Sequence, residues 1–298
     1  MLRAAYGLRF DSALPLPELL PTDGLAADAD VQVRFGNVDE AGLAGGTQVG
    51  PFAWASPDAL WLQVPRIARY LVRRGCEIVI DPAPGIDDDS LRLFLLGSCV
   101  GALLFQRGLL VLHGNAVQIG EDCLVCVGPS GAGKSTLAAA FLRRGYPVIA
   151  DDVTPVDQHG RVLAGIPRIK LWQDSASALS IDTEPLRRIR PVLEKFDVPV
   201  PAPPGDTAVP LRWVYLLQPE NRDDVAIEAV PGLQRFMPLR DNTYRQNFLS
   251  GMGLGSEHLA LIGRLASQVR LSRLRRPTAG FTVEAMIDAI LDDVAAHP

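Results

Sequence analysis

One stretch of this chain has the residue types and spacing of a phosphate-binding loop. It reads Gly128-Pro129-Ser130-Gly131-Ala132-Gly133-Lys134-Ser135 and matches G-x-x-x-x-G-K-[ST] at every fixed position. Small residues let backbone N–H groups turn inward around a polyphosphate, and the following helix adds the positive end of its dipole. Lys134 would reach the β- and γ-phosphates of ATP, and the Ser135 hydroxyl would bind Mg²⁺. Thr136 completes the predicted nucleotide-binding segment.

Two adjacent carboxylates, Asp151 and Asp152, begin seventeen positions after Lys134. That separation leaves room for one helix and one return strand, which would bring the pair to the ligand edge of an α/β sheet. One carboxylate would face the metal and the other the phosphoryl acceptor. Unless a cation neutralises one of them, repulsion between the adjacent carboxylates would raise the pKa of the other toward the range of a general base. The alternative is a pair that binds metal only.

The elements that must position these residues follow from the surrounding pattern. An apolar run over 123–127 predicts a strand before the loop, and 136–144 predicts a helix that ends at Gly145. Residues 147–150 predict the strand that delivers the acidic pair. The hairpin-like turn at 120–122 predicts antiparallel neighbours for the loop strand, and therefore a mixed sheet.

A C-x-x-C pattern, Cys123 and Cys126, lies inside the predicted loop strand. Residues three apart on a strand face opposite sides of the sheet, so we interpret them as two buried apolar thiols and not as a redox or metal pair. His159, His258 and His297 show no ligand spacing, and no zinc site is predicted.

The rest of the chain divides into a smaller α+β N-terminal region over 1–107 and a catalytic domain over 108–298. Within the first, helices are predicted over 66–74 and 90–107. The second helix follows Asp87-Asp88-Asp89, which is typical of an N-terminal cap; a metal site is the alternative. In the catalytic domain, two long irregular segments are predicted, and we expect one of them to cover the acceptor side of Asp152. They are the proline-rich 197–210 and the glycine-containing 250–256.

Composition restricts the classes of partner. The 298 residues carry a formal net charge of −5, so there is no overall basic footprint for nucleic acid. The longest apolar run, 93–105, is shorter than the ~20 residues that span a bilayer, and the first residues lack a signal peptide's apolar region. We therefore expect a cytoplasmic protein without a membrane partner. Only three of the 29 basic residues are lysines, which makes the placement of Lys134 more informative.

Arginines could stabilise the negative charge of the transferred phosphoryl group. Five are candidates for this role: Arg168, Arg240, Arg245, Arg275 and Arg276. Arg168, near the expected ligand edge, and Arg245 are the preferred phosphate or acceptor contacts. The alternative for each is a solvated surface residue. His113, at the end of a predicted strand beside the loop strand, is either structural or hydrogen-bonded to a catalytic aspartate.

These residues together resemble the catalytic domain of HPr kinase/phosphorylase and its relatives. The resemblance is carried by His113-Gly114, the loop 128–135, Arg144-Gly145 and Asp151-Asp152, and it is strongest over 109–172. It implies an α/β fold of the P-loop variant shared with phosphoenolpyruvate carboxykinases. It also implies that Asp152 is the general base, that Asp151 with Ser135 binds the metal, and that His113 is hydrogen-bonded nearby. Thr136 departs from the pattern, because the family has an acidic residue there.

The resemblance implies an ATP- and Mg-dependent kinase that phosphorylates a serine of a peptide or small protein. Relatives of this shorter type resemble the peptide-tailoring kinases of lasso-peptide and similar pathways. The chain has no match to the arginine- and glycine-rich C-terminal signature linked to phosphorolysis. A small-molecule P-loop kinase and a nucleotide-binding regulatory pseudokinase are the alternatives. The acceptor, the phosphoryl donor and the oligomeric state, a homo-oligomer included, are left open by the residues.

Overall fold

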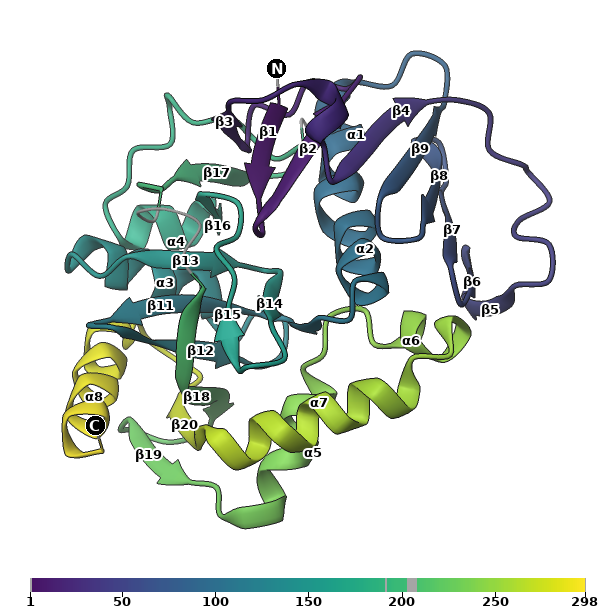
Figure 1. Ribbon diagram of the computed structural model, residues 1–298. Coiled ribbons are helices and arrows are strands. Elements are labelled where there is room, and N and C mark those ends of the chain that lie inside the picture. The colour runs from purple at the N-terminus through teal and green to yellow at the C-terminus, as the bar shows by residue number, and fades with distance from the viewer. Residues whose placement is uncertain (1, 191, 203–207, 298) are drawn as a thin grey trace.

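The computed structural model describes residues 2–190, 192–202 and 208–297. Two nine-stranded sheets lie beside each other in the molecule, and a two-stranded ribbon packs next to the second (Figure 1). The fold class is therefore mixed α/β with several mixed sheets. Among the described residues, no helix combines the length and apolar character needed to cross a membrane. The predicted boundary between residues 107 and 108 stays a prediction.

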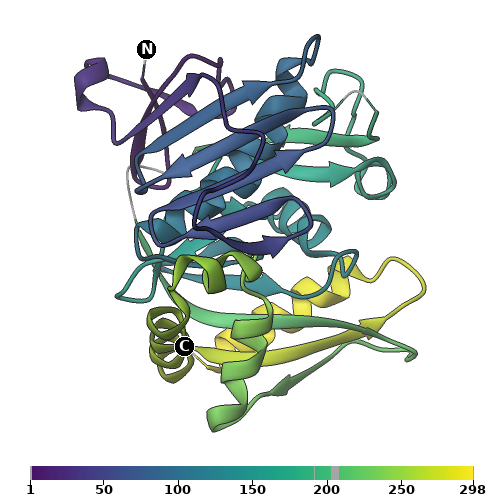
Figure 2. The same ribbon diagram turned by 90° about the vertical axis from the view of Figure 1, so that its right-hand side faces the viewer.

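The first sheet contains all the strands before residue 83. In spatial order it runs β3-β1-β2-β4-β9-β8-β7-β6-β5, with parallel pairs at β2–β4 and β4–β9. The strands are β1 (Leu2–Ala5), β2 (Leu8–Ser12), β3 (Leu20–Thr22), β4 (Val31–Phe35), β5 (Thr47–Gly50), β6 (Ala53–Ser56), β7 (Ala59–Val64), β8 (Ala68–Arg73) and β9 (Glu77–Pro82). A 3₁₀ turn, η1, covers Ala26–Asp28. Figure 2 shows this sheet facing the viewer.

The predicted helix over 66–74 is wrong, because these residues contain the whole of β8. Tyr70 and Val72 pack into the core on one face of the sheet, while Leu71 packs into a smaller cluster on the other. This alternation has the period of a strand, and both faces of β8 are covered. A run that is apolar on both faces of a strand is easily mistaken for one turn of a buried helix.

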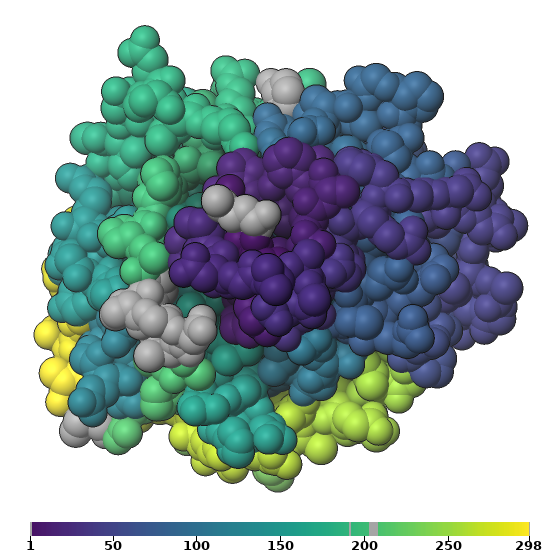
Figure 3. Space-filling model, turned by 45° about the horizontal axis from the view of Figure 1, so that its top comes forward, coloured from purple at the N-terminus to yellow at the C-terminus, as the bar shows by residue number. Residues whose placement is uncertain are grey.

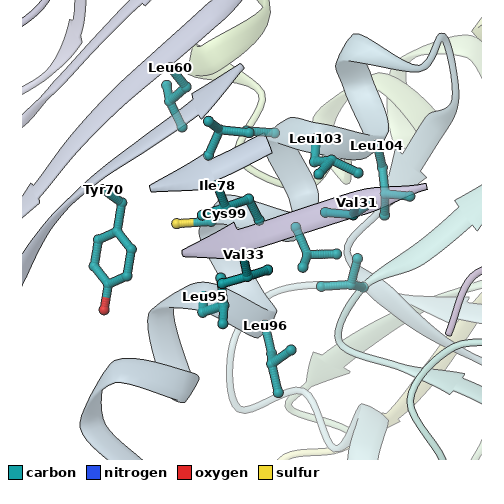
Figure 4. Packing of buried hydrophobic residues seen from close by; sticks show 14 of the residues in the cluster. Val31, Val33, Leu60, Tyr70, Ile78, Leu95, Leu96, Cys99, Leu103 and Leu104 are labelled. Carbon is teal, nitrogen blue, oxygen red and sulfur yellow. The ribbon is translucent and has the colours of Figure 1, made fainter. Parts of the chain in front are cut away.

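One long interrupted helix covers the first sheet. α1 (Asp88–Phe94) is capped by Asp87, whose side chain accepts a hydrogen bond from the Ser90 amide, as the capping interpretation predicts. A π-helical segment (η2, Leu95–Cys99) leads into α2 (Val100–Gln106). Figure 4 shows side chains of this helix packed against Val31, Val33 and Ile78 of the sheet. The predicted single helix over 90–107 is thus present with a π turn inside it.

The second sheet holds the predicted loop strand near its centre. Its order is β10-β14-β15-β18-β12-β11-β13, with β20 beside β18 and β19 beside β20. The strands are β10 (Leu110–Leu112), β11 (Gly114–Ile119), β12 (Asp122–Val127), β13 (Val148–Asp151), β14 (Thr154–Val156), β15 (Arg161–Val162), β18 (Val209–Glu220), β19 (Ala226–Ala229) and β20 (Arg270–Pro277). β12 pairs antiparallel with β11 and parallel with β18, so the sheet is mixed, as predicted.

Helices cover both faces of this sheet (Figure 1). α3 (Lys134–Arg143) and α8 (Val283–Ala296) pack on one face, and α5 (Phe236–Asp241) and α7 (Gly255–Gln268) on the other. Cys126 lies in the first of these cores and Cys123 in the second, and both are fully buried. The interpretation of the C-x-x-C pattern as two buried thiols on opposite faces is confirmed.

The remaining elements join the two sheets. The ribbon consists of β16 (Arg168–Trp172) and β17 (Lys195–Pro199), with α4 (Gln173–Ala178) after β16. A short 3₁₀ turn, η3 (Gly232–Arg235), precedes α5, and α6 (Asn247–Met252) packs into the core of the first sheet. Residues 250–256 therefore contain the end of α6 and the start of α7, so the predicted irregular segment is wrong there. The predicted loop over 197–210 begins with the end of β17, and its residues 203–207 lie outside the described residues.

Candidate active site

The glycine-rich loop joins β12 to α3, in the strand–loop–helix order that the motif requires. Gly128, Gly131 and Gly133 have φ angles of 146°, 80° and 99°, a region open mainly to glycine. At Gly128 a Cβ would also lie 2.8 Å from the carbonyl oxygen of Leu217 on β18. The glycines are thus required by the backbone, and the N-terminus of α3 is open to an anion.

The acidic pair sits at the end of β13, where the chain makes a strained turn. Asp152 has a φ of 73°, in the left-handed region that non-glycine residues seldom occupy. Such conformations cost on the order of 1–3 kcal/mol and cluster at functional sites. The turn gives the two neighbouring carboxylates different partners.

Asp151 faces the loop side of the site. Its Oδ1 accepts a hydrogen bond from the Ser135 hydroxyl at 3.0 Å, and its Oδ2 accepts one from the Lys170 amide at 2.9 Å. A hydroxyl and a carboxylate oxygen side by side fit the donor set of Mg²⁺, which takes few protein ligands beside phosphate oxygens and water. Among the described residues, no group of three or more His, Cys, Asp or Glu side chains forms an all-protein metal cage.

Asp152 lies between two nitrogen donors. The Lys170 ammonium lies 2.9 Å from its Oδ2, and His113 Nδ1 lies 3.2 Å from its Oδ1. His113 is held at the junction of β10 and β11, where its amide donates to the Asn242 carbonyl at 2.7 Å. The ring of Tyr244 packs beside it, with ring centres 5.8 Å apart. The carboxylate of Asp152 is therefore fixed in position.

The pKa values of the two aspartates shift in opposite directions. Burial, and then the neighbouring charge of Asp152, raise the pKa of Asp151. Burial would also raise the pKa of Asp152, but the Lys170 ammonium and the hydrogen bonds from His113 and Lys170 together hold it well below its usual range. The raised pKa thus belongs to Asp151 and the lowered one to Asp152, which is opposite to the expectation of a raised pKa on the acceptor side.

All three lysines of the chain line one cavity of about 240 Å³, which we call the loop cavity. Its lining residues are His113, Ser130, Gly131, Gly133, Lys134, Ser135, Thr136, Asp151, Asp152, Lys170, Leu171, Trp172, Ser175 and Lys195. The Lys134 ammonium donates to the carbonyls of Gly128 and Pro129, at 2.8 and 3.1 Å. Sequence reasoning missed Lys195 and left Lys170 without a role, although the scarcity of lysine was a usable signal.

A second cavity, also of about 240 Å³, adjoins the first and shares Gly131, Gly133, Thr136 and Ser175 with it. We call it the α8 cavity, because Val283 and Met286 of α8 line it, together with the exposed Phe281. The Thr136 and Ser175 hydroxyls lie 2.9 Å apart at the shared wall. At Thr136 the site therefore has a neutral hydroxyl pair instead of a carboxylate.

The preferred arginines do not line the loop cavity. Arg168 is buried and donates to Asp197 at 2.7 Å. Arg245 is exposed, with its guanidinium 5.9 Å from the ring centre of Tyr244. Arg240 pairs with Asp241, and Arg275 with Glu228. Arg276 alone of the five candidates contacts the loop, where its Nε donates to the Ala132 carbonyl at 3.0 Å.

Comparisons with known proteins give one kind of match. No family model matches the chain, and no curated protein matches it. Among solved structures, the chain is similar to the HPr(Ser) kinase/phosphatase from Coxiella burnetii, with 13% sequence identity and a TM-score of 0.29. That alignment covers 62% of this chain and 90% of the other. Function has to be argued from the site itself.

Proposed function

We propose that this chain is an ATP- and Mg-dependent kinase that phosphorylates a serine of a peptide or small protein, on a catalytic part of the HPr kinase/phosphoenolpyruvate carboxykinase type. The observation that carries the proposal is that the two neighbouring aspartates have different partners. Asp151 shares its hydrogen bonds with Ser135 and the ribbon backbone, whereas Asp152 points to His113 and Lys170. A site that only held a metal would need one carboxylate in this position.

The residues support a phosphoryl-transfer mechanism in which the protein mainly positions and neutralises. The loop amides and Lys134 would hold the phosphates, and Lys134 would exchange two carbonyl contacts for phosphate oxygens. Mg²⁺, held by Ser135 and Asp151, would supply charge neutralisation at the phosphates. Asp152 would accept the proton of the attacking serine hydroxyl, while His113 keeps the carboxylate oriented.

The α8 cavity supports a nucleotide as the phosphoryl donor. It continues directly from the loop at Gly131 and Gly133, and its apolar wall includes Phe281 and Met286. A cavity with an apolar wall next to a phosphate loop suits a nucleobase, and Thr282 in its lining could hydrogen-bond the base. The guanidinium of Arg276, which touches both the loop and this cavity, would lie beside the phosphates or ribose.

The ribbon next to Asp152 is where the proposed serine acceptor would approach. Lys170 and Trp172 share a face of the ribbon with Arg168, because alternate strand residues point to the same side. The first two line the loop cavity, and Arg168 lines a further cavity of about 440 Å³. Lys170 and Arg168 are buried, whereas Trp172 is 52% exposed. An acceptor would therefore approach Asp152 past Trp172.

The test is transfer of radiolabel from ATP to an array of serine-containing peptides, with and without Mg²⁺, by the wild-type protein and by Asp152→Asn. Label on serine peptides that requires both Mg²⁺ and Asp152 is the expected result. Label on small metabolites alone would establish the small-molecule kinase. Tight nucleotide binding with no transfer to any acceptor would establish the regulatory pseudokinase.

A further inference from the structure

The Lys195 ammonium is the one cation of the loop cavity without a polar partner among the described residues. Lys134 is engaged with loop carbonyls and Lys170 with Asp152. Lys195, on β17, makes no ion pair and no hydrogen bond through its Nζ within the described part of the chain. Its Nζ instead lies 5.4 Å from the ring centre of Trp172, its direct neighbour across the ribbon.

A partly buried ammonium without hydrogen-bond acceptors costs stability unless a ligand supplies those acceptors. Burial lowers the pKa of Lys195, while the nearby charges of Asp152 and Asp151 act in the other direction. The same carboxylates already have partners of their own, so they attract Lys195 only from a distance. A cation held by an aromatic face, next to a cavity and short of acceptors, is arranged to receive anionic oxygens.

The charge of the loop cavity identifies the kind of anion. Its lining contains three ammonium groups and two carboxylates, so it has a formal surplus of one positive charge when His113 is neutral. Lys195 lines this cavity together with Lys134, which would hold the donor, and Asp152, which would activate the acceptor. The charges of these groups interact with that of Lys195. All three groups therefore face the space that a phosphoryl group would cross from donor to acceptor.

We propose that Lys195 binds the transferred phosphoryl group and that Trp172 is its positioning residue; the inference rests on the proposed kinase function. In the step, the bond between the γ-phosphorus and its bridging oxygen breaks, and ADP keeps that electron pair. A new bond forms between the phosphorus and the serine oxygen, whose proton passes to Asp152. Lys195 exchanges no proton and no electrons. It supplies charge that an arginine supplies in other phosphoryl-transfer sites.

The proposal predicts that loss of Lys195 weakens the affinity for a nucleoside triphosphate but not that for the diphosphate. Lys195 would touch the γ-phosphoryl group, so Lys195→Met should weaken binding of Mg²⁺ with a non-hydrolysable ATP analogue by about 10- to 100-fold, the usual range for a lost charged hydrogen bond. Binding of Mg²⁺-ADP should stay within about twofold. Lys195→Arg keeps the charge and should lose much less. Trp172→Leu should cost the triphosphate about two- to fivefold.

Isothermal titration with both nucleotides measures each of these ratios without a known acceptor. Arg212→Met is the control. It also removes a cation, but Arg212 is exposed and lies on β18, at the end of that strand away from the phosphate loop. Equal losses for both nucleotides, or no loss for either, would overturn the role of Lys195. If the wild-type protein itself binds neither nucleotide, the proposed function fails instead. Should Lys195→Met not fold, Lys195→Gln against Lys195→Arg gives the same comparison.

Discussion

The β16–β17 ribbon carries two groups of charged residues that meet at its centre, where Lys170 lies directly opposite Asp197. The first group, which we call the lysine end, consists of Lys170 and Lys195, which line the loop cavity; Lys195 has no polar partner among the described residues. The second group, which we call the arginine network, consists of Glu18, Arg92, Arg168, Arg187 and Asp197. Charges are therefore paired throughout the arginine network, whereas the lysine end keeps one cation, Lys195, available to a ligand.

The arginine network ties the N-terminal region to the ribbon. Glu18, whose side chain is 4% exposed, accepts from Arg92 at 3.0 Å and from Arg187. Asp197 of β17 accepts from Arg168 at 2.7 Å and from Arg187 at 3.3 Å. Figure 3 shows the N-terminal segments beside the chain that contains the ribbon. The network therefore holds the first sheet against the element that carries Lys170 and Lys195.

The largest effect is expected for Asp152→Asn, at the carboxylate that pairs with Lys170 of the lysine end. Phosphoryl transfer should be largely lost while nucleotide binding is kept. Asp152→Asn keeps the shape of the side chain but cannot accept the serine proton, so phosphoryl transfer should fall about 10²- to 10⁴-fold. Nucleotide affinity should change little, because the ion pairs of Asp152 go to His113 and Lys170 and none goes to the phosphate loop among the described residues. Turnover with radiolabelled ATP and titration calorimetry check the two halves. Wild-type turnover would place the base elsewhere, with Asp151 the first alternative.

The next largest effect is expected from disrupting the arginine network, and it should lower the free energy of unfolding. Glu18→Ala removes a buried carboxylate and leaves Arg92 without its 3.0 Å acceptor. Each of the three arginines that pair with Glu18 keeps another carboxylate, Asp89 or Asp197. The loss should therefore be about 1–3 kcal/mol, the cost of unmade buried hydrogen bonds. Urea unfolding should show that loss, and the folded variant should still bind Mg²⁺-ATP.

Glu40→Ala is the control for Glu18→Ala, because Glu40 also pairs with an arginine but its side chain is 83% exposed. Its loss should be at most about 1 kcal/mol. Equal losses for the two variants would mean that the network contributes no more than a surface pair. One oxygen of Glu18 and one of Asp197 are buried without a protein partner among the described residues, which limits the network's net contribution.

The third effect concerns the loop cation. Lys134→Ala should weaken Mg²⁺-ATP and Mg²⁺-ADP together, because this lysine would contact the β-phosphate as well as the γ-phosphate. A loss of about 10- to 100-fold is expected for a charged contact. Calorimetry with both nucleotides distinguishes it from Lys195→Met, whose loss should be confined to the triphosphate. Unchanged ATP affinity in Lys134→Ala would contradict the phosphate-loop interpretation.

Local pattern predicted the elements around the loop cavity well. The strand, loop and helix over 122–143 and the return strand before Asp151 follow from apolar runs and glycine punctuation. These signals are contained within a few residues. The same local reasoning was wrong for 66–74, where burial on both faces of β8 hides the strand period, and for 250–256, where glycines lie in and between helices.

The sequence could not predict what the ribbon brings to the site. Lys170 and Lys195 are 25 positions apart, and their cavity depends on the pairing of β16 with β17. Arg168 lies two positions before Lys170 on the same face, yet Asp197 and Glu18 hold it in the arginine network. Contacts across such separations decide whether a basic residue serves a ligand or a neighbour, and no local pattern contains them.

The smallest expected effect is on stability, measured without nucleotide and metal. Here the two aspartates should contribute with opposite signs. A raised pKa means that the folded state disfavours ionised Asp151, so this group lowers stability at neutral pH. Its cost disappears as the pH falls through its folded pKa. Asp152 has the opposite sign: its lowered pKa adds stability above the unfolded value of about 3.9, and that stability is lost as the pH falls toward its folded pKa.

Asp151→Asn should therefore raise the free energy of unfolding by roughly 0.5–2 kcal/mol, as removal of functional strain often does. The amide can still accept from the Lys170 N–H and donate to the Ser135 hydroxyl, so no hydrogen bond need be lost. Asp152→Asn should lower the same quantity, because it leaves the Lys170 ammonium without its carboxylate. Urea unfolding at pH 7 with EDTA measures both variants. A loss of stability in Asp151→Asn would mean that its charge already has a compensating partner, and the opposition between the two carboxylates would then not hold.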